Sequence, residues 1–199
     1  MSTPLVVICC SVLKKELEAV LGFAYPGTER IYIDSMLHMH PAKLHRTMEE
    51  IMSARPGSPC LVVYGDCHAY MSEIEKHHHC ARTAGVNCGE LLLGQEQYKI
   101  FRREKAFLFL PEWTWRWREV FQKELGFSDP ILAREFMQEN SHSLVYLHTG
   151  LCPIPEKTIS EISTFFAMPV RITEVPLDHL RMAVQSALKR IEGINSDEL

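Results

Sequence analysis

Three segments of the chain share one layout, in which a short apolar run ends at or just before a cysteine and the sequence then turns polar. The runs cover residues 5–10, 60–67 and 143–148, and the cysteines at or just beyond their ends are Cys10, Cys67 and Cys152. Short continuous runs of β-branched residues predict strands that are buried on both faces of a parallel sheet. Because open α/β sheets build their sites at the carboxyl ends of their strands, we expect these cysteines to emerge at one sheet edge.

Helical periodicity and turn residues predict the elements that connect these runs. We expect further strands over residues 30–34, 106–110 and 170–175, and helices over residues 12–21, 41–55, 113–126, 131–140, 156–166 and 177–191. Strands that alternate with helices are typical of an α/β fold with a mainly parallel sheet and helices on both faces. Two or three similar α/β units could build such a fold. Residues 1–192 are expected to form a single α/β domain, and residues 193–199 a flexible tail.

Composition excludes several classes of protein. Hydrophobic residues make up 46% of the 199 residues and the net charge is -4, with no long basic run, so neither nucleic acid nor a membrane is an expected partner. The first residues lack the basic region of a signal peptide, which predicts a cytoplasmic protein. Disulfides are disfavoured in that compartment, so the seven cysteines are available as ligands, redox groups, nucleophiles or buried thiols.

The first candidate site is a set of three cysteines, Cys10, Cys67 and Cys88, with Cys152 as an optional fourth. Thiolates that arrive from separate strand ends could bind an iron–sulfur cluster, zinc or a cobalt-containing cofactor, because soft sulfur ligands suit these metals. The chain has no Cys-x-x-Cys motif, so the alternative of buried, unligated thiols stays open.

A second candidate set consists of His68 and the stretch 77–80, which reads His-His-His-Cys. These side chains could hold zinc, but three neighbouring histidines cannot all face one ion from a regular element, so a solvated polar loop is the favoured interpretation. His68, His40 and Glu90 are the candidates for proton transfer or for orienting a ligand. A helix cap or a surface position is the alternative for Glu90, and His40 could simply face water.

Aromatic residues could contact a cofactor. All three tryptophans lie within residues 113–117, and Trp113 could wall a planar ligand, although core packing explains such rings equally well. Tyr64 and Gly65 precede Cys67 and are the other residues that we expect to bind a cofactor. The chain has no Walker loop, no Gly-x-Gly-x-x-Gly and no Gly-x-Ser-x-Gly, so the usual nucleotide and serine-hydrolase signatures are missing.

The chain resembles an uncharacterised family, the domain of unknown function family 1638. The resemblance depends on residues 8–11, 16–17, 40–41, 63–67, 87–94 and 98. It carries over Cys10, Cys67 and Cys88 as the cysteines of the family, and it implies a role near metallocofactors in anaerobic metabolism, in some cases beside corrinoid-dependent methyltransferases. The chain departs from the family pattern at Ser11, at His68 and in the stretch 77–80.

Residues and resemblance together predict a cytoplasmic protein that binds a metallocofactor, with an iron–sulfur cluster held by Cys10, Cys67 and Cys88 as the first choice. One alternative is a zinc- or corrinoid-dependent methyl-transfer protein, and another is a cofactor-free accessory or chaperone protein with structural thiols. A small molecule or a corrinoid protein is the expected partner. The sequence leaves open whether the protein is an enzyme, and it does not indicate the oligomeric state.

Overall fold

Contacts within the chain divide it into two compact units. The structure is a computed structural model, and it describes residues 3–22, 25, 27–67, 69–76 and 79–197, with side chains described to residue 193. The first unit combines Met1–Leu92 with Leu177–Leu199, and the second is Leu93–Pro176. Each unit has its own parallel sheet, so the α/β class and the parallel pairing are confirmed. The single domain over residues 1–192 stays a prediction.

The sheet of the first unit has four parallel strands in the order β2-β1-β3-β4. The strands are β1 (Val6–Cys10), β2 (Glu29–Ile33), β3 (Cys60–Val63) and β4 (Cys80–Arg82). Every residue of β1 and β3 is buried, as expected for the central strands of a sheet with both faces covered. Such strands read as continuous apolar runs, which is why the sequence reveals them.

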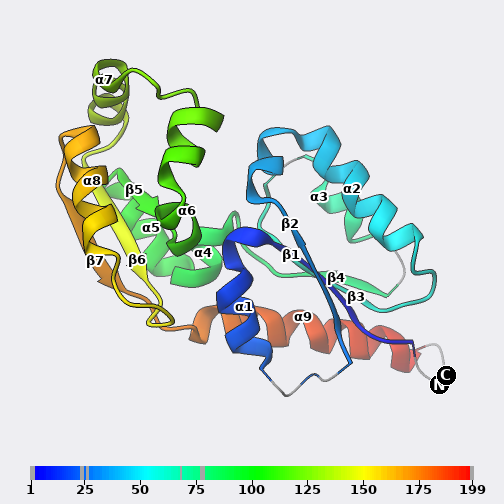
Figure 1. Cartoon of the computed structure of the whole chain (residues 1–199). Helices are drawn as coiled ribbons and strands as arrows, with labels where there is room; N and C mark the ends of the chain where they lie inside the picture. Colours follow the sequence, from blue (N-terminus) through cyan, green and yellow to red (C-terminus); the bar gives the residue numbers. More distant parts are fainter. Residues whose placement is uncertain (1–2, 23–24, 26, 68, 77–78, 198–199) are drawn as a thin grey trace. The chain divides into compact units, whose positions relative to one another are not determined.

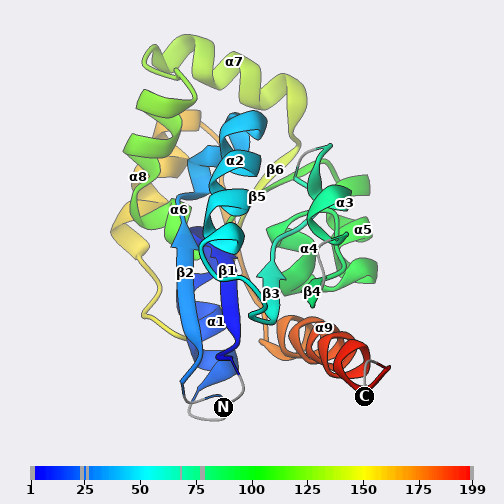
Figure 2. The ribbon, with the colours of Figure 1, turned by 90° about the vertical axis from the view of Figure 1, so that its right-hand side faces the viewer.

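Helices cover both faces of this sheet. They are η1 (Ser11–Leu13), α1 (Lys14–Leu21), η2 (Ser35–Met39), α2 (Pro41–Ser53), α3 (Met71–Ile74), α4 (Cys88–Leu93) and α9 (Asp178–Asp197). Figure 1 shows α2 and α3 on one face, with α1 and α9 on the other, and Figure 2 gives the same layers from the side. Helix α9 contacts β3, β4 and α1, so this late segment of the sequence packs against the early segments within the first unit.

The second unit contains a three-stranded parallel sheet in the order β5-β6-β7. Its elements are α5 (Gln95–Arg103), β5 (Ala106–Phe109), α6 (Pro111–Trp115), the π-helical segment η3 (Arg118–Glu124), α7 (Pro130–Asn140), β6 (Ser143–His148), α8 (Glu156–Phe166) and β7 (Val170–Glu174). Helices α5, α6 and α8 contact the strands. Phe121 lies between Phe109 and Phe166 in the core, with ring centroids 5.0 and 5.8 Å away.

Several sequence-based expectations are corrected here. The third apolar run forms β6, which belongs to a different sheet from β1 and β3, so the three runs do not share one sheet. Cys80 is buried and opens strand β4, where a solvated loop was expected. Helix α9 continues to Asp197, so much of the expected tail is helical.

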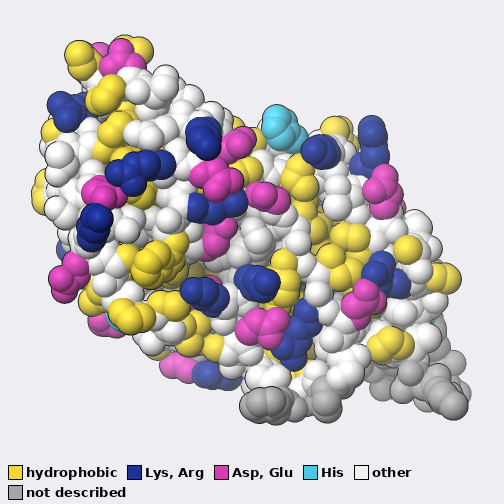
Figure 3. Space-filling model, viewed as in Figure 1, with side chains coloured by type: hydrophobic (Ala, Val, Ile, Leu, Met, Phe, Trp, Pro, Cys, Tyr) yellow, Lys and Arg dark blue, Asp and Glu magenta, His cyan; other side chains and the backbone are white. Residues whose placement is uncertain are grey.

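Charge is distributed without a large patch of one sign on the face in Figure 3, where basic and acidic side chains lie side by side. This mixture agrees with the small net charge of -4. Within the described ranges, no helix has the length and apolarity that a membrane span requires.

Candidate functional site

The three cysteines predicted as ligands follow the carboxyl ends of three neighbouring strands. Cys10 is the last residue of β1, Cys67 lies four residues beyond the end of β3, and Cys88 follows β4 as the first residue of α4. Because β1 pairs with β3 and β3 pairs with β4, all in parallel, the three chain segments leave the sheet at the same edge. The topology of the sheet thereby brings together residues that are tens of positions apart in the sequence.

The Cys88 thiol joins the other two. The Cys88 thiol is hydrogen-bonded to the side chains of both Cys10 and Cys67. Cys10 and Cys88 are buried, and Cys67 is half-buried. As the side chains stand, the described residues include no group of three or more His, Cys, Asp or Glu arranged to hold a metal ion. The cysteines therefore form a hydrogen-bonded group around Cys88, and metal binding would require the coordinating thiols to lose their protons.

Backbone packing brings the Cys67 and Cys88 segments together. A β-carbon on Gly65 would lie 2.2 Å from the Asn87 Cα, so only glycine allows the two segments to approach this closely. The Asp66 N–H donates to the Gly85 carbonyl at 2.9 Å and joins the same two segments. Gly65 therefore contributes to the site because it has no side chain that would keep the Cys67 and Cys88 segments apart.

Thr83 provides a second link between these segments, immediately after β4. Its side chain is buried, and its hydroxyl donates to the Tyr64 carbonyl at 3.1 Å. Its N–H donates to the Val62 carbonyl at 2.9 Å, which extends the pairing of β4 with β3 by one residue. Two hydrogen bonds from one residue thus fix how the chain leaves both strands.

Cys67 and Cys88 differ in the direction in which their surroundings shift the pKa of the thiol. The hydrogen bond donated by Cys88, the Gly65 N–H and the Arg82 charge lower the pKa of Cys67, against the opposing effects of burial and of Asp66. Hydrogen bonds to Cys10 and Cys67, together with burial, raise the pKa of Cys88 well above its usual value. Cys67 is therefore the first of this pair to become a thiolate, and the buried Cys88 is the harder one to ionise.

Arg82 places a largely buried positive charge beside this cluster. Its side chain is 11% exposed, and Nη2 lies 3.4 Å from Asp66 Oδ1 and 3.3 Å from Glu75 Oε2. The Nε and Nη1 atoms are buried and have no hydrogen-bond partner among the described residues. A guanidinium in this state can balance additional negative charge nearby.

The Tyr64 hydroxyl is also buried and has no hydrogen-bond partner in the described part of the chain. Burial raises the pKa of Tyr64, and the neighbouring thiol groups, those of Cys10 and Cys9 most strongly, raise it further. A buried donor left unsatisfied costs about 1–3 kcal/mol, so its presence beside sulfur atoms needs an explanation.

Glu90 has a structural position at the start of α4. Its Oε2 accepts the Val86 N–H at 2.5 Å, and its own N–H donates to Asn87 Oδ1 at 3.0 Å. The two bonds are related to a capping box, but the Glu90 carboxylate accepts from the residue before Asn87, and together they fix the turn that carries Cys88. A catalytic role for Glu90 stays a prediction.

The remaining predicted residues lie elsewhere or outside the description. His40 is exposed at the start of α2, where its carbonyl accepts the Leu44 N–H at 3.0 Å. Trp113 and Cys152 belong to the second unit. His68 and residues 77–78 lie outside the described residues. The sequence interpretation missed Arg82 and Thr83, because a strand of three residues after a histidine-rich stretch has too little periodicity to be recognised.

Comparison with known proteins identifies one family. The model of the family described as "Protein of unknown function (DUF1638)" matches residues 32–184, which is more than half of the chain. The match includes Cys67 and Cys88, while Cys10 precedes it. No curated protein and no solved structure shows significant similarity to the chain.

Proposed function

Since the chain belongs to the DUF1638 family, whose description assigns no activity, we propose from its own residues that it binds a metallocofactor through Cys10, Cys67 and Cys88. The observation that carries this proposal is the contact of the Cys88 thiol with both other thiols at one sheet edge. An iron–sulfur cluster is the first candidate, because thiolates are the usual ligands of such clusters. The same proposal includes a cytoplasmic location and a small-molecule or corrinoid-protein partner in anaerobic metabolism.

Three cysteine ligands are one fewer than a four-iron cluster can take. A cluster bound in this way would supply electron transfer, or an open iron position for a substrate. Cys67 is the residue that would bind first, because its pKa is lowered and it is the most accessible of the three. Cys88 would lose its proton last, once a metal replaces the hydrogen bonds that it now makes.

Two other side chains support an anionic group at this place. Arg82 has buried Nε and Nη1 donors without described partners, and its charge already acts on Cys67. The Tyr64 hydroxyl is a second donor of this kind, beside the thiols. Hydrogen bonds to sulfur and nearby charge are the means by which a protein adjusts the potential of a cluster.

A single zinc ion is the second candidate, and the close contact of the thiols favours it. Zinc–sulfur bonds of about 2.3 Å in a tetrahedral site place the sulfur atoms about 3.8 Å apart, similar to the spacing of hydrogen-bonded thiols. Zinc would keep a thiolate nucleophilic at neutral pH, which suits methyl transfer with a corrinoid partner.

Anaerobic purification followed by metal analysis and an absorption spectrum tests the proposal. Iron and sulfide with a broad band near 400 nm, roughly where iron–sulfur clusters absorb, would support the first candidate. Colourless protein with one equivalent of zinc would support zinc as the cofactor. A corrinoid spectrum would support the corrinoid that the sequence analysis gives as an alternative. Protein that takes up no metal, even after anaerobic reconstitution, would contradict the proposal and favour structural thiols.

Cys9 and Cys10 offer a matched pair of variants for locating the site. Both are buried in β1, but the Cys9 thiol donates to the Cys10 carbonyl at 3.2 Å, whereas the Cys10 side chain contacts Cys88. Cys10→Ala should lose the metal, and Cys9→Ala should keep it with a similar loss of stability. Equal metal content in both variants, and in Cys67→Ala, would place the site elsewhere.

A further inference from the structure

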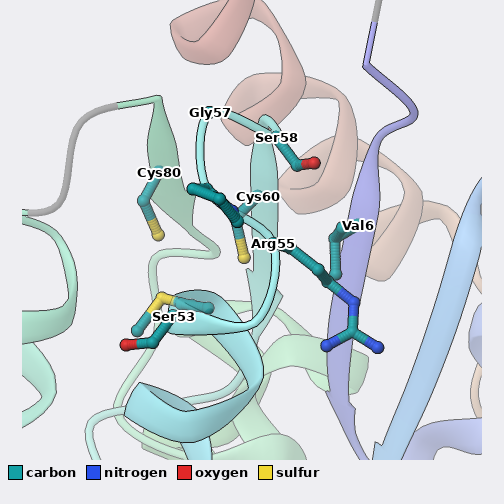
Figure 4. Close-up of a pocket in the computed structure, with 9 residues that line it drawn as sticks. Val6, Ser53, Arg55, Gly57, Ser58, Cys60 and Cys80 are labelled. Atoms are coloured by element: carbon teal, nitrogen blue, oxygen red, sulfur yellow. The ribbon is translucent and has the colours of Figure 1, made fainter.

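A second pair of thiols lies at the opposite end of the same sheet. Cys60 is the first residue of β3 and Cys80 the first residue of β4, and the two are register partners in this parallel pair. Each is about 5% exposed. Figure 4 shows both sulfur atoms pointing into the pocket, with Ser53 on its other side. The pair is separate from Cys10, Cys67 and Cys88, which follow the carboxyl ends of the strands.

The two thiols have the spacing that a disulfide requires. Neighbouring strands lie about 4.8 Å apart, and disulfides form between residues whose Cα atoms are about 4.4–6.8 Å apart. Register partners also present their side chains on the same face of a sheet. The Cys60 thiol already donates a hydrogen bond to the Cys80 sulfur, so the sulfur atoms are in contact.

We propose that Cys60 and Cys80 form a dithiol site that reacts with small-molecule disulfides and closes a disulfide between β3 and β4. The pocket that holds them has a volume of about 270 Å³. A pocket of this size can hold a small-molecule disulfide with short substituents, but it is too small for a folded protein. Val6, Arg55 and Ser58 line other sides of the pocket. Arg55 pairs with Glu29, whose Oε2 accepts from Nε at 2.7 Å.

The two thiols have different roles in this reaction. The hydrogen bond from Cys60 lowers the pKa of Cys80, against burial and the charges of Glu75 and Glu49, while the same hydrogen bond and burial raise the pKa of Cys60. Cys80 is therefore the attacking thiolate and Cys60 the resolving thiol.

The exchange proceeds in two balanced steps. The Cys80 thiolate attacks one sulfur of the small disulfide, forms a mixed disulfide and releases one small thiolate. Cys60 then gives up its proton and attacks the Cys80 sulfur, which releases the second small thiolate. The two protons of the cysteines end on the two small thiols. The protein pair is oxidised by two electrons, and the small disulfide is reduced.

Peptide mapping of the whole chain tests this proposal, with 2-hydroxyethyl disulfide as the probe under anaerobic conditions. After incubation the remaining thiols are alkylated, the protein is digested, and fragmentation distinguishes Cys60 from Cys67. The expected product is a cross-link between Cys60 and Cys80 with the loss of two hydrogen atoms. Cys60 and Cys80 that both stay alkylated, or a cross-link confined to Cys67 and Cys88, would overturn the proposal.

Single variants separate the two roles. Cys60→Ser should stop at a mixed disulfide on Cys80, and Cys80→Ser should leave Cys60 at least tenfold slower to react. Cys152→Ser, in the second unit, should form the cross-link as the parent protein does. If a variant does not fold, the order of alkylation in the parent protein decides, since Cys80 must react before Cys60. Protection of both thiols by one equivalent of zinc would instead show a metal site and contradict the exchange.

Discussion

The backbone of Asn87 lies so close to Gly65 that a β-carbon at position 65 would fall 2.5 Å from the Asn87 nitrogen and 2.8 Å from its carbonyl carbon. Real β-carbons do not approach backbone atoms this closely, so any other residue must push the two segments apart. These segments carry Cys67 and Cys88. The contact therefore links a single glycine to the geometry of the thiol cluster.

Gly65→Ala is expected to destabilise the protein by about 1–3 kcal/mol, because the backbone of Asn87 must move. It should also weaken metal uptake, since Cys67 and Cys88 separate. Urea unfolding and metal titration measure the two effects. Gly193→Ala is the control, because a β-carbon there meets nothing within 4 Å, and alanine should stabilise helix α9 by about 0.5–1 kcal/mol. Unchanged stability of Gly65→Ala would show that the close approach does not exist.

Tyr64→Phe removes a buried hydroxyl that has no partner among the described residues. The metal-free variant should be at least as stable as the parent protein, because an unsatisfied donor is lost. If the hydroxyl donates to the proposed cofactor, the loaded variant should gain less stability from that cofactor than the parent protein does. Chemical unfolding with and without the cofactor measures both effects. Tyr32→Phe is the contrast, because the Tyr32 hydroxyl donates to Glu18 and its loss should destabilise. A metal-free Tyr64→Phe protein that unfolds more easily would mean that the hydroxyl has a partner.

Arg82→Gln removes the positive charge that helps to lower the pKa of Cys67. The pKa of Cys67 should rise, so alkylation of Cys67 by iodoacetamide near pH 7 should slow several-fold in metal-free protein. The dependence of this rate on pH gives the shift directly. Arg82→Lys keeps the charge and should restore most of the rate. Equal rates for the Gln and Lys variants would assign the role of Arg82 to packing.

Glu18→Gln tests an ion pair at the edge of the first sheet. The hydrogen bond from Tyr32 lowers the pKa of Glu18, burial opposes this effect, and the charge of Arg30 lowers the pKa further. The Glu18 side chain is 41% exposed, so the pair contributes no more than about 1 kcal/mol after screening. Because the folded pKa lies below the unfolded value of about 4.3, this stability is present above that pH and is lost as the pH falls through the folded pKa.

At pH 7 the variant should accordingly unfold at a lower urea concentration than the parent protein. This gap between the two urea midpoints should close below about pH 4. Added salt should narrow the same gap. A gap that stays constant from pH 7 to pH 3 would point to lost packing, because packing does not titrate in this range.

Sequence reasoning succeeds where local pattern and topology agree. The runs that form β1 and β3 are apolar because both faces are covered, and parallel strands place their carboxyl ends together. The meeting of Cys10, Cys67 and Cys88 follows from these two facts and the short connection to α4. Their role as metal ligands remains a prediction.

The rest of the site depends on contacts between distant residues. Nothing local in the sequence indicates that Arg82 lies beside Cys67, or that the Tyr64 hydroxyl lacks a partner. Strand β4 is too short for its period to stand out, which concealed the Cys60 and Cys80 pair. The run that forms β6 has the same local pattern as β1, because membership of one sheet or another is decided by packing and not by local composition.

Helix α9 has a consequence for biosynthesis. It packs on β3 and β4, and Arg190 donates a hydrogen bond to the carbonyl of Arg82. A nascent chain that ends before residue 177 holds every cysteine, yet one face of its first sheet lacks this cover. We therefore expect Cys10, Cys67 and Cys88 to take up the proposed metallocofactor only after the ribosome has released α9.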